Sequence, residues 1–175
     1  MKKISLPLSD EAADELRAGD GVLLSGTIYT ARDCAHKRMF AALDAGEKLP
    51  FPLHGALIYY AGPCPAPEGK AIGSCGPTTS ARMNSFAPRL LDLGLGGMIG
   101  KGEMSPETQE ALVRNKRVYF AAIGGAGAAY ANAVKKSTLI AYPDLLSEAV
   151  YALEVIDFPV VVAYDCHGGS VYRRG

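Results

Sequence analysis

Short apolar runs recur along the chain at intervals that suit a layered α/β domain. A strand covered on both faces reads as a continuous apolar run, and several such runs are separated by stretches of helical character. The last three runs have little helical sequence between them, so a mixed sheet layered with helices is expected. The predicted strands are 21–28, 57–60, 97–100, 118–123, 138–141, 152–155 and 160–164.

Helices are predicted between these strands from capping residues and apolar spacing. The segment Thr30-Ala31-Arg32-Asp33 has the form of a capping box, which places a helix start at Thr30. Ser105-Pro106-Glu107 combines a cap, a proline at the first helical position and an acid in the first turn. An Ala-rich helix is predicted over 124–136, and another from Thr79, which Pro88 must break or kink.

Length and charge narrow the class of protein. The 175 residues, 49% of them hydrophobic, predict one compact domain over 1–175. Lys and Arg number 18 and so do Asp and Glu, and this balance argues against nucleic acid as a partner. The chain shows no secretory signal and no run of the roughly 20 strongly apolar residues that span a bilayer. A soluble cytoplasmic protein without a membrane partner is therefore expected.

Common cofactor and catalytic motifs are missing from the sequence. The segment 94–102 fails the phosphate-loop pattern, because Leu95 and Gly102 stand where Gly and Ser or Thr are needed. No G-x-S-x-G motif is present. The cysteines form no C-x-x-C pair, which argues against a disulfide framework and against a metal cage built from this chain. They are Cys34, Cys64, Cys75 and Cys166.

Cations and hydroxyls stand at the predicted junctions between strands and helices. Arg32 follows the first predicted strand, Lys101 follows the third, and Thr78 and Arg82 lie four residues apart beside a helix start. Ligand sites of α/β sheets lie outside the carboxyl ends of strands, so one crevice is expected. Three cations suit an acid with two carboxylates, because arginine offers each carboxylate a planar fork. From the residues alone this is a small-anion site, with surface helix arginines as the alternative.

The motifs GTIYTARD, GPTTS-x-R and GMIGKG, in this order, resemble the β subunit of two-subunit class I fumarate hydratases. That family includes the β subunit of L-tartrate dehydratase and the C-terminal domain of the single-chain enzymes. The resemblance covers nearly the whole chain. Its segments are 19–39, 49–83, 94–105, 118–128 and the closing EVIDFPVVVAYDCHGGSVY (154–172).

The resemblance implies a fold, a reaction and a partner. The fold is the swivelling β/β/α type, and the reaction is the reversible dehydration of (S)-malate to fumarate, a step of the tricarboxylic acid cycle. A partner α subunit binds a 4Fe-4S cluster on three cysteines, and its open iron acts as a Lewis acid. The assembly is a heterotetramer of two α and two β chains, with a homodimer contact as one element. No metal ligand is expected in this chain.

Individual residues acquire roles when the family motifs are matched to them. Arg32 in TARD and Arg82 in TTSAR match arginines that bind substrate carboxylates, and Lys101 in GKG matches a substrate-binding lysine. Thr78 in GPTTS matches a threonine proposed as the catalytic base, assisted by an aspartate of the α subunit. A threonine hydroxyl is a very poor base in water, so this role needs strong activation. The alternative for Thr78 is a helix cap.

Four further residues are expected to lie next to the residues that bind the substrate. Asp33 is interpreted as a cap and arginine partner, and Gly76 as a point of close backbone approach. Thr79 belongs to the same motif as the proposed base. His36 lies one helical turn from Arg32. Two positions of its imidazole stay open, one beside the site and one on the exposed surface.

Two alternative functions stay open at this stage. One is the β subunit of an L-tartrate dehydratase, which converts tartrate to oxaloacetate and whose substrate differs by one hydroxyl. The segments 28–31 and 58–60 resemble fumarase-type sequences more, which favours malate and fumarate. The other is a non-catalytic paralogue that binds dicarboxylates. Malate binding without turnover, after an α subunit and its cluster are supplied, would favour the paralogue.

Overall fold

The sheet combines parallel and antiparallel strands. The computed structural model describes residues 1–62, 78–122, 130 and 132–172, and in this part of the chain seven strands follow the order β1-β2-β3-β4-β5-β7-β6. The strands from β1 to β5 run parallel, whereas β7 is antiparallel to β2, β5 and β6. The predicted mixed α/β architecture is confirmed. The strands are β1 (Lys2–Ser5), β2 (Gly21–Thr30), β3 (Leu57–Tyr59), β4 (Gly97–Gly100), β5 (Val118–Ala121), β6 (Val134–Ala141) and β7 (Val150–Tyr164).

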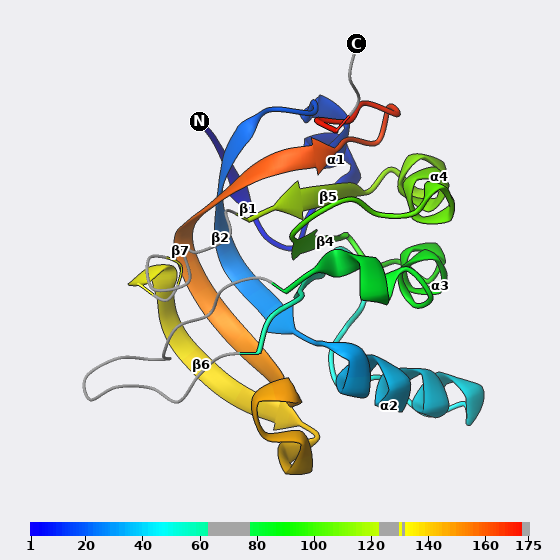
Figure 1. Ribbon diagram of the computed structural model, residues 1–175. Helices are drawn as coiled ribbons and strands as arrows, with labels where there is room; N and C mark the ends of the chain where they lie inside the picture. Colours follow the sequence, from blue (N-terminus) through cyan, green and yellow to red (C-terminus); the bar gives the residue numbers. More distant parts are fainter. Residues whose placement is uncertain (63–77, 123–129, 131, 173–175) are drawn as a thin grey trace.

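The two long strands, β2 and β7, pair with each other along most of their length. Their register runs from Gly21 opposite Val161 to Tyr29 opposite Ala152. The other edge of β2 pairs first with β1 and then with β3, while the other edge of β7 pairs with β6 and then with β5. Strands β2, β3, β4, β5 and β7 therefore close into a barrel-like ring, from which β1 and β6 extend (Figure 1).

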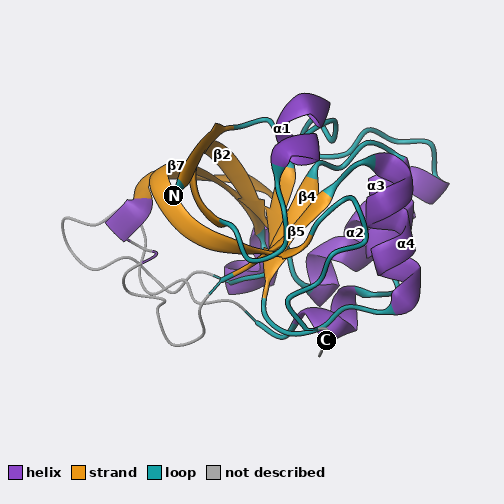
Figure 2. Cartoon of the chain, turned by 90° about the horizontal axis from the view of Figure 1, so that it is seen from above, coloured by secondary structure: helices purple, strands orange, loops and turns teal. Residues whose placement is uncertain are grey.

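Alternating strand residues feed two separate apolar cores, because successive side chains point to opposite faces. In β3, Leu57 and Tyr59 belong to the core inside the ring, and Ile58 belongs to the core on the outer face. Helices α2 (Asp33–Asp44), α3 (Ala87–Asp92) and α4 (Pro106–Asn115) cover that outer face together (Figure 2). Helix α1 (Asp10–Glu15) instead packs Ala13 against the inner core.

The start of α2 differs from the prediction. The helix begins at Asp33, with Arg32 as an N-cap that makes no side-chain cap bond. Thr30 instead ends β2, and its hydroxyl accepts a hydrogen bond from the Tyr151 amide at 3.1 Å. The capping-box interpretation is wrong because β7 supplies Thr30 with a tertiary partner. The predicted cap of α4 is confirmed, since Ser105 accepts from the amide of the third helical residue at 3.3 Å.

Other element boundaries also need correction. The helix predicted from Thr79 is a short 3-10 turn, η1 (Ser80–Met83), and α3 begins separately with Pro88 in its first turn. Most of the helix predicted over 124–136 lies outside the described residues, and residues 134–136 belong to β6. The two strands predicted over 152–155 and 160–164 are one continuous strand, β7. In the described part of the chain, no helix is long and apolar enough to cross a membrane.

Candidate functional site

The carboxyl ends of β2, β3 and β4 meet at one edge of the sheet. Backbone hydrogen bonds fix the residues that follow β2 and β3. The Ala31 amide donates to the Tyr59 carbonyl at 3.1 Å, and the Tyr60 amide donates to Ile99 at 2.9 Å. Arg32 directly follows the first of these contacts. The residues that directly follow neighbouring strands therefore lie side by side, as expected for the carboxyl ends of adjacent parallel strands.

Thr78 and Thr79 join this edge through hydrogen bonds with the strand ends. The Thr78 amide and hydroxyl both donate to the Tyr60 carbonyl oxygen, at 2.8 and 2.9 Å. Thr79 forms an isolated parallel bridge with Lys101, which follows β4. Arg82 comes three residues later, in η1. The predicted group of Arg32, Thr78, Arg82 and Lys101 thus lies along adjacent strand ends; Gly76 falls outside the described residues.

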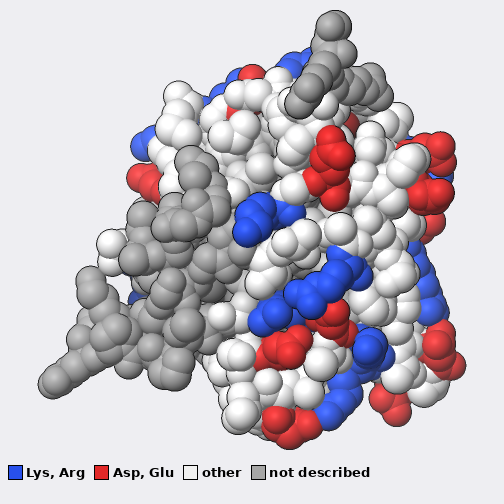
Figure 3. All heavy atoms as spheres, viewed as in Figure 1, with Lys and Arg blue, Asp and Glu red and all other residues white. Residues whose placement is uncertain are grey.

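Three cations stand at this edge, and one of them, Arg82, lies near the carboxylate of Asp33. A terminal nitrogen of Arg82 lies 4.0 Å from Asp33 Oδ2, and the Arg82 side chain is 56% exposed. In the part of the chain that is described, Arg32 and Lys101 form no salt bridge. Figure 3 shows basic and acidic side chains next to one another over the region of α2. Arg32 and Lys101 are thus two cations without an ionic partner in the described part of the chain, which suits an anionic ligand.

The first turn of α2 also contains unusual buried polar atoms. Among the described residues, four buried side-chain nitrogen or oxygen atoms lack a hydrogen-bond partner. Three of them are Arg32 Nε, Asp33 Oδ1 and His36 Nε2, and the fourth is Arg117 Nε. A buried polar atom without a partner costs about 1–3 kcal/mol, so this turn is poorly satisfied within the chain alone. Such departures from good pairing are expected at functional sites.

His36 is buried and electrically neutral, so the surface interpretation of this residue is wrong. Its Nδ1 lies 2.8 Å from the Arg32 carbonyl oxygen, and because a carbonyl only accepts, Nδ1 carries the proton. Burial lowers the pKa of His36 from 6.5 to about 4, although that carbonyl and the Asp33 charge oppose the shift. The ring packs against Phe86 with centroids 5.1 Å apart. His36 therefore supports the backbone of Arg32 from within the core.

The Thr78 hydroxyl is oriented by a group that cannot act as a base. Its proton points to the Tyr60 carbonyl oxygen, which has no appreciable basicity. In the described part of the chain, no carboxylate or imidazole is hydrogen-bonded to Thr78. The helix-cap alternative is wrong, because Thr79 precedes η1 directly and Thr78 bonds to the strand end. A catalytic role for Thr78 would therefore require an activating group from outside the described residues.

Sequence reasoning missed two buried hydroxyls beneath these residues. Ser80 and Tyr119 are both fully buried, and their hydroxyl oxygens lie 2.8 Å apart. A Cβ on Gly100 would lie 1.9 Å from Ser80 Oγ, so only glycine permits this approach. Tyr119 lies in an apolar strand, where a tyrosine cannot be told from an ordinary core residue. The adjacency of Ser80 to the motif threonines was the one available signal.

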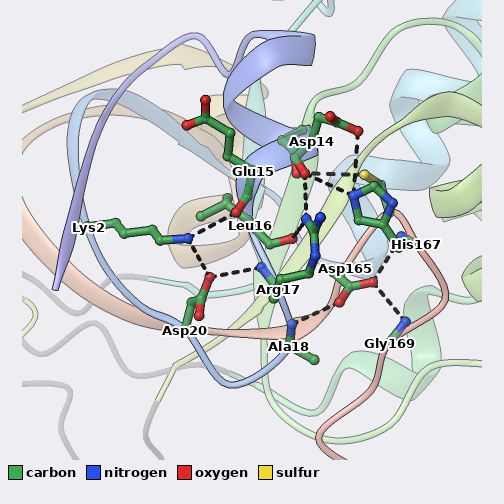
Figure 4. Close-up of polar contacts among 12 residues, drawn as sticks. Lys2, Asp14, Glu15, Leu16, Arg17, Ala18, Asp20, Asp165, His167 and Gly169 are labelled. Carbon is green, nitrogen blue, oxygen red and sulfur yellow. Dashed lines mark hydrogen bonds and ion pairs between the residues drawn. The ribbon is translucent and has the colours of Figure 1, made fainter.

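A second group of polar side chains lies between α1 and the end of β7. Atoms of Asp14, Cys166 and His167 that could bind a metal lie within 4.8 Å of one another. Helix α1 already accounts for two of them: Cys166 Sγ lies 3.6 Å from the Ala13 carbonyl oxygen, and His167 Nε2 lies 2.9 Å from that of Asp14 (Figure 4). These contacts satisfy carbonyls at a helix end, which is a structural role.

The cysteines of the described residues do not fit an iron-sulfur cluster. Cys34 contacts Glu148, which precedes β7, whereas Cys166 follows the end of that 15-residue strand. The two thiols therefore stand at opposite ends of a long strand and cannot bind one cluster. Cys64 and Cys75 lie outside the described residues.

Comparisons with known proteins identify relatives of this chain. A sequence profile of the family described as "Fumarase C-terminus" matches residues 1–175. The "Putative L(+)-tartrate dehydratase subunit beta" of Methanocaldococcus jannaschii is 42% identical over 173 residues, which cover 95% of this chain and 89% of that protein. "Fumarate hydratase 2" of Leishmania major is 40% identical over 159 residues, which cover 89% of this chain and 28% of that protein.

The enzymes named as fumarate hydratases are much longer than this chain. "Fumarate hydratase class I, aerobic" of Escherichia coli K12 is 39% identical over 154 residues, and these cover 86% of this chain but 28% of that protein. This chain thus spans under a third of these two fumarate hydratases and most of the Methanocaldococcus jannaschii subunit. The profile and these relatives lead to one conclusion: the chain belongs to the fumarase C-terminus family.

Proposed function

We propose that this chain is the β subunit of an iron-sulfur hydro-lyase that interconverts (S)-malate and fumarate plus water. The observation that carries the proposal is the row of Arg32, Arg82 and Lys101 at adjacent strand ends, where the one ion pair that they form among the described residues joins Arg82 to Asp33. Three cations on segments that backbone hydrogen bonds hold beside one another suit a dicarboxylate.

The basic residues hold the substrate's carboxylates in this proposal. Arg32 is fixed at the start of α2, and Arg82 stands on the adjoining turn, so the two guanidinium groups can bind separate carboxylates. Lys101 adds a point charge from the neighbouring strand end. Holding both ends of the substrate aligns the C2 hydroxyl and the C3 proton for elimination. This clamp is the part of the chemistry that belongs to this chain.

The remaining groups come from a partner. Loss of hydroxide from C2 requires an electrophile, and a 4Fe-4S cluster of the α subunit supplies that Lewis acid when it is bound. Removal of the C3 proton requires a base, which we assign to Thr78 activated by a carboxylate of the α subunit. The hydrogen bond from Thr78 to Tyr60 fits a hydroxyl that is positioned by this chain and activated by another.

The lengths of the relatives support a two-subunit enzyme. This chain covers 89% of a relative named as a subunit beta, but 28% of an enzyme named "Fumarate hydratase class I, aerobic". We therefore propose that the missing part is a separate α chain, and that two of each assemble into a heterotetramer.

Tartrate is the second candidate substrate, and the Methanocaldococcus jannaschii relative favours it. That protein matches this chain with 42% identity and is named for L(+)-tartrate. Malate and tartrate differ by one hydroxyl, and a clamp on the two carboxylates would bind either. The choice between them therefore belongs to residues that contact the second hydroxyl.

One experiment tests the proposal and the substrate together. The chain is coexpressed with an α subunit, reconstituted with iron and sulfide without oxygen, and assayed with malate, fumarate and tartrate. We expect turnover of malate and fumarate, and an Arg82→Ala loss of kcat/KM of ~100-fold or more, because a substrate carboxylate loses its charged partner. Arg89→Ala is the matched control, because Arg89 is an exposed arginine paired with Asp44 outside the site.

The outcomes separate the candidates. Turnover of tartrate alone would identify a tartrate dehydratase subunit. Binding of malate with no turnover of any substrate would identify the non-catalytic paralogue. Equal activity of the Arg82→Ala and Arg89→Ala complexes would remove Arg82 from the site.

A further inference from the structure

A row of hydrogen-bonded groups runs beneath the exposed ends of the site. The Lys101 amide donates to Ser80 Oγ at 2.9 Å, the Ser80 and Tyr119 oxygens lie 2.8 Å apart, and Tyr119 Oη lies 2.8 Å from the Gly102 carbonyl oxygen. Both hydroxyl-bearing residues have no solvent exposure. The row therefore begins and ends in the segment that carries Lys101, and it passes through β5.

The chemistry of the end groups fixes the direction of every proton in the row. A carbonyl oxygen only accepts, so the Tyr119 hydroxyl donates to Gly102. Because Tyr119 has one proton, its oxygen must accept from the Ser80 hydroxyl at the second contact. Ser80 in turn accepts from the Lys101 amide. This single arrangement satisfies all four groups, so the row is fully paired rather than adjustable.

The row links the two segments that carry cations. Ser80 also donates its backbone amide to the Lys101 carbonyl at 2.9 Å, so it contacts both backbone polar groups of Lys101. Arg82 lies two residues after Ser80 in the same 3-10 turn. The segment around Lys101 is flanked by Gly100 and Gly102, which lose much conformational freedom when they are fixed. Anchoring this segment to Tyr119 removes that freedom before a ligand arrives.

We propose that Ser80 and Tyr119 are positioning residues that hold Lys101 and Arg82 in one fixed arrangement for a dicarboxylate. This inference rests on the proposed function, because it takes Lys101 and Arg82 as the groups that bind the substrate. Neither Ser80 nor Tyr119 contacts substrate in this account. Their effect is to reduce the ordering that the two cations would otherwise undergo when the ligand binds.

Tyr119→Phe is the direct test in the reconstituted complex. The ring keeps its stacking on Tyr164, with centroids 5.5 Å apart, but Ser80 and Gly102 each lose a partner. We expect kcat/KM and the affinity for succinate, a dicarboxylate that cannot react, to fall about 10-fold. Tyr164→Phe is the matched control, because it also removes a buried hydroxyl, one that accepts from the Met104 amide instead. We expect less than about a 2-fold change there.

A double-mutant cycle distinguishes positioning from general loss of stability. If Tyr119 acts through Lys101, Tyr119→Phe should add less than about 2-fold in a Lys101→Ala background. Equal losses in both backgrounds would overturn the inference, as would a Tyr119→Phe complex with unchanged succinate affinity. If Tyr119→Phe does not fold, Ser80→Ala is measured in the same cycle. Absence of wild-type turnover would reject the proposed function, while the succinate measurements would still decide this inference.

Discussion

Two ends of this molecule carry groups of charged and polar side chains, and the two groups are paired very differently. Between α1 and the end of β7, Asp165 accepts hydrogen bonds from the amides of Ala18, His167 and Gly169 at 2.7–2.9 Å. Lys2 nearby pairs with Asp20 at 2.8 Å. At the carboxyl ends of β2, β3 and β4, by contrast, Arg32 and Lys101 have no ionic partner among the described residues.

Under the proposed function, the contrast separates charges that stabilise the fold from charges that bind a ligand. The Asp165 group satisfies its own atoms and joins the chain's two ends, so its presence is explained by folding. The strand-end group leaves Arg32 Nε, Asp33 Oδ1 and His36 Nε2 without partners, at a cost in stability. A bound ligand would pair the cations Arg32 and Lys101, whereas His36 Nε2 lies in the core, out of reach of a ligand. This difference predicts opposite outcomes for substitutions at the two ends.

The largest expected effect is on activity, at the strand ends. Arg32→Ala in the reconstituted complex should lower kcat/KM by ~100-fold or more and should not lower the free energy of unfolding, because the buried Arg32 Nε has no partner to lose. Arg38→Ala is the control on the same helix, since Arg38 pairs with the exposed Asp144. Steady-state kinetics and urea unfolding measure the two quantities. A loss of stability with full activity for Arg32→Ala would reverse the assignment.

The next effect is on stability, at the opposite end. Asp165→Ala removes the acceptor of three backbone hydrogen bonds, so the free energy of unfolding should fall by about 2–4 kcal/mol. Activity per folded complex should stay within about 2-fold of wild type. Urea titration of the chain and kinetics at matched folded concentration test both parts. A specific loss of activity here would break the contrast between the two ends.

A smaller effect concerns pH and the His36 imidazole. Its folded-state pKa is lowered to about 4 from 6.5, so the unfolded chain takes up a proton first as the pH falls. Stability should therefore be intact above pH 6.5 and should decline toward pH 4, with a loss of about 2 kcal/mol between pH 7 and pH 5. His36→Gln should remove this decline of stability with falling pH. His167→Gln, a substitution of a partly exposed histidine, should leave the decline in place. A His36→Gln chain with the same acid loss would contradict the assignment.

The smallest effect is expected for an exposed ion pair on the helical face. Arg114 contacts Asp92 through two nitrogens at 3.0 Å, with both side chains about half exposed. Arg114→Ala should change the free energy of unfolding by about 0.5–1 kcal/mol at most, and leave kcat/KM unchanged. A larger effect in thermal or urea unfolding would show that pairing alone does not distinguish structural from surface charges.

Continuous apolar runs in the sequence predicted much of the sheet. Capping and periodicity patterns gave wrong element boundaries where a tertiary contact determines the local structure. β4 lies where the sequence placed it, because four buried residues in a row leave little choice. β7 was predicted as two strands, whereas the structure has one continuous strand in which Asp157 adopts a left-handed φ of 53°. The strand continues because the Asp157 amide bonds to Ser25 Oγ at 3.0 Å across a bulge. A contact between residues 132 positions apart in sequence cannot be predicted from the periodicity of hydrophobic residues.

The grouping of the candidate site residues was predicted from their positions after strands. The buried residues that support them were not predicted. Arg32, Arg82 and Lys101 could be placed together because residues that follow parallel strands share an edge. The burial of His36 could not, because helical spacing alone does not say which face meets Phe86. Ser80 and Tyr119 were missed because their pairing depends on the close approach that Gly100 allows.

The central claim is that this chain supplies the cationic half of a catalytic site that a second chain completes. The most direct measurement is malate dehydration by a fixed amount of this chain as the reconstituted α subunit is added. We predict no activity without the α subunit, a rise to a plateau near equal amounts, and no plateau with Arg82→Ala. Malate dehydration by this chain alone, or a plateau that Arg82→Ala leaves unchanged, would contradict the claim.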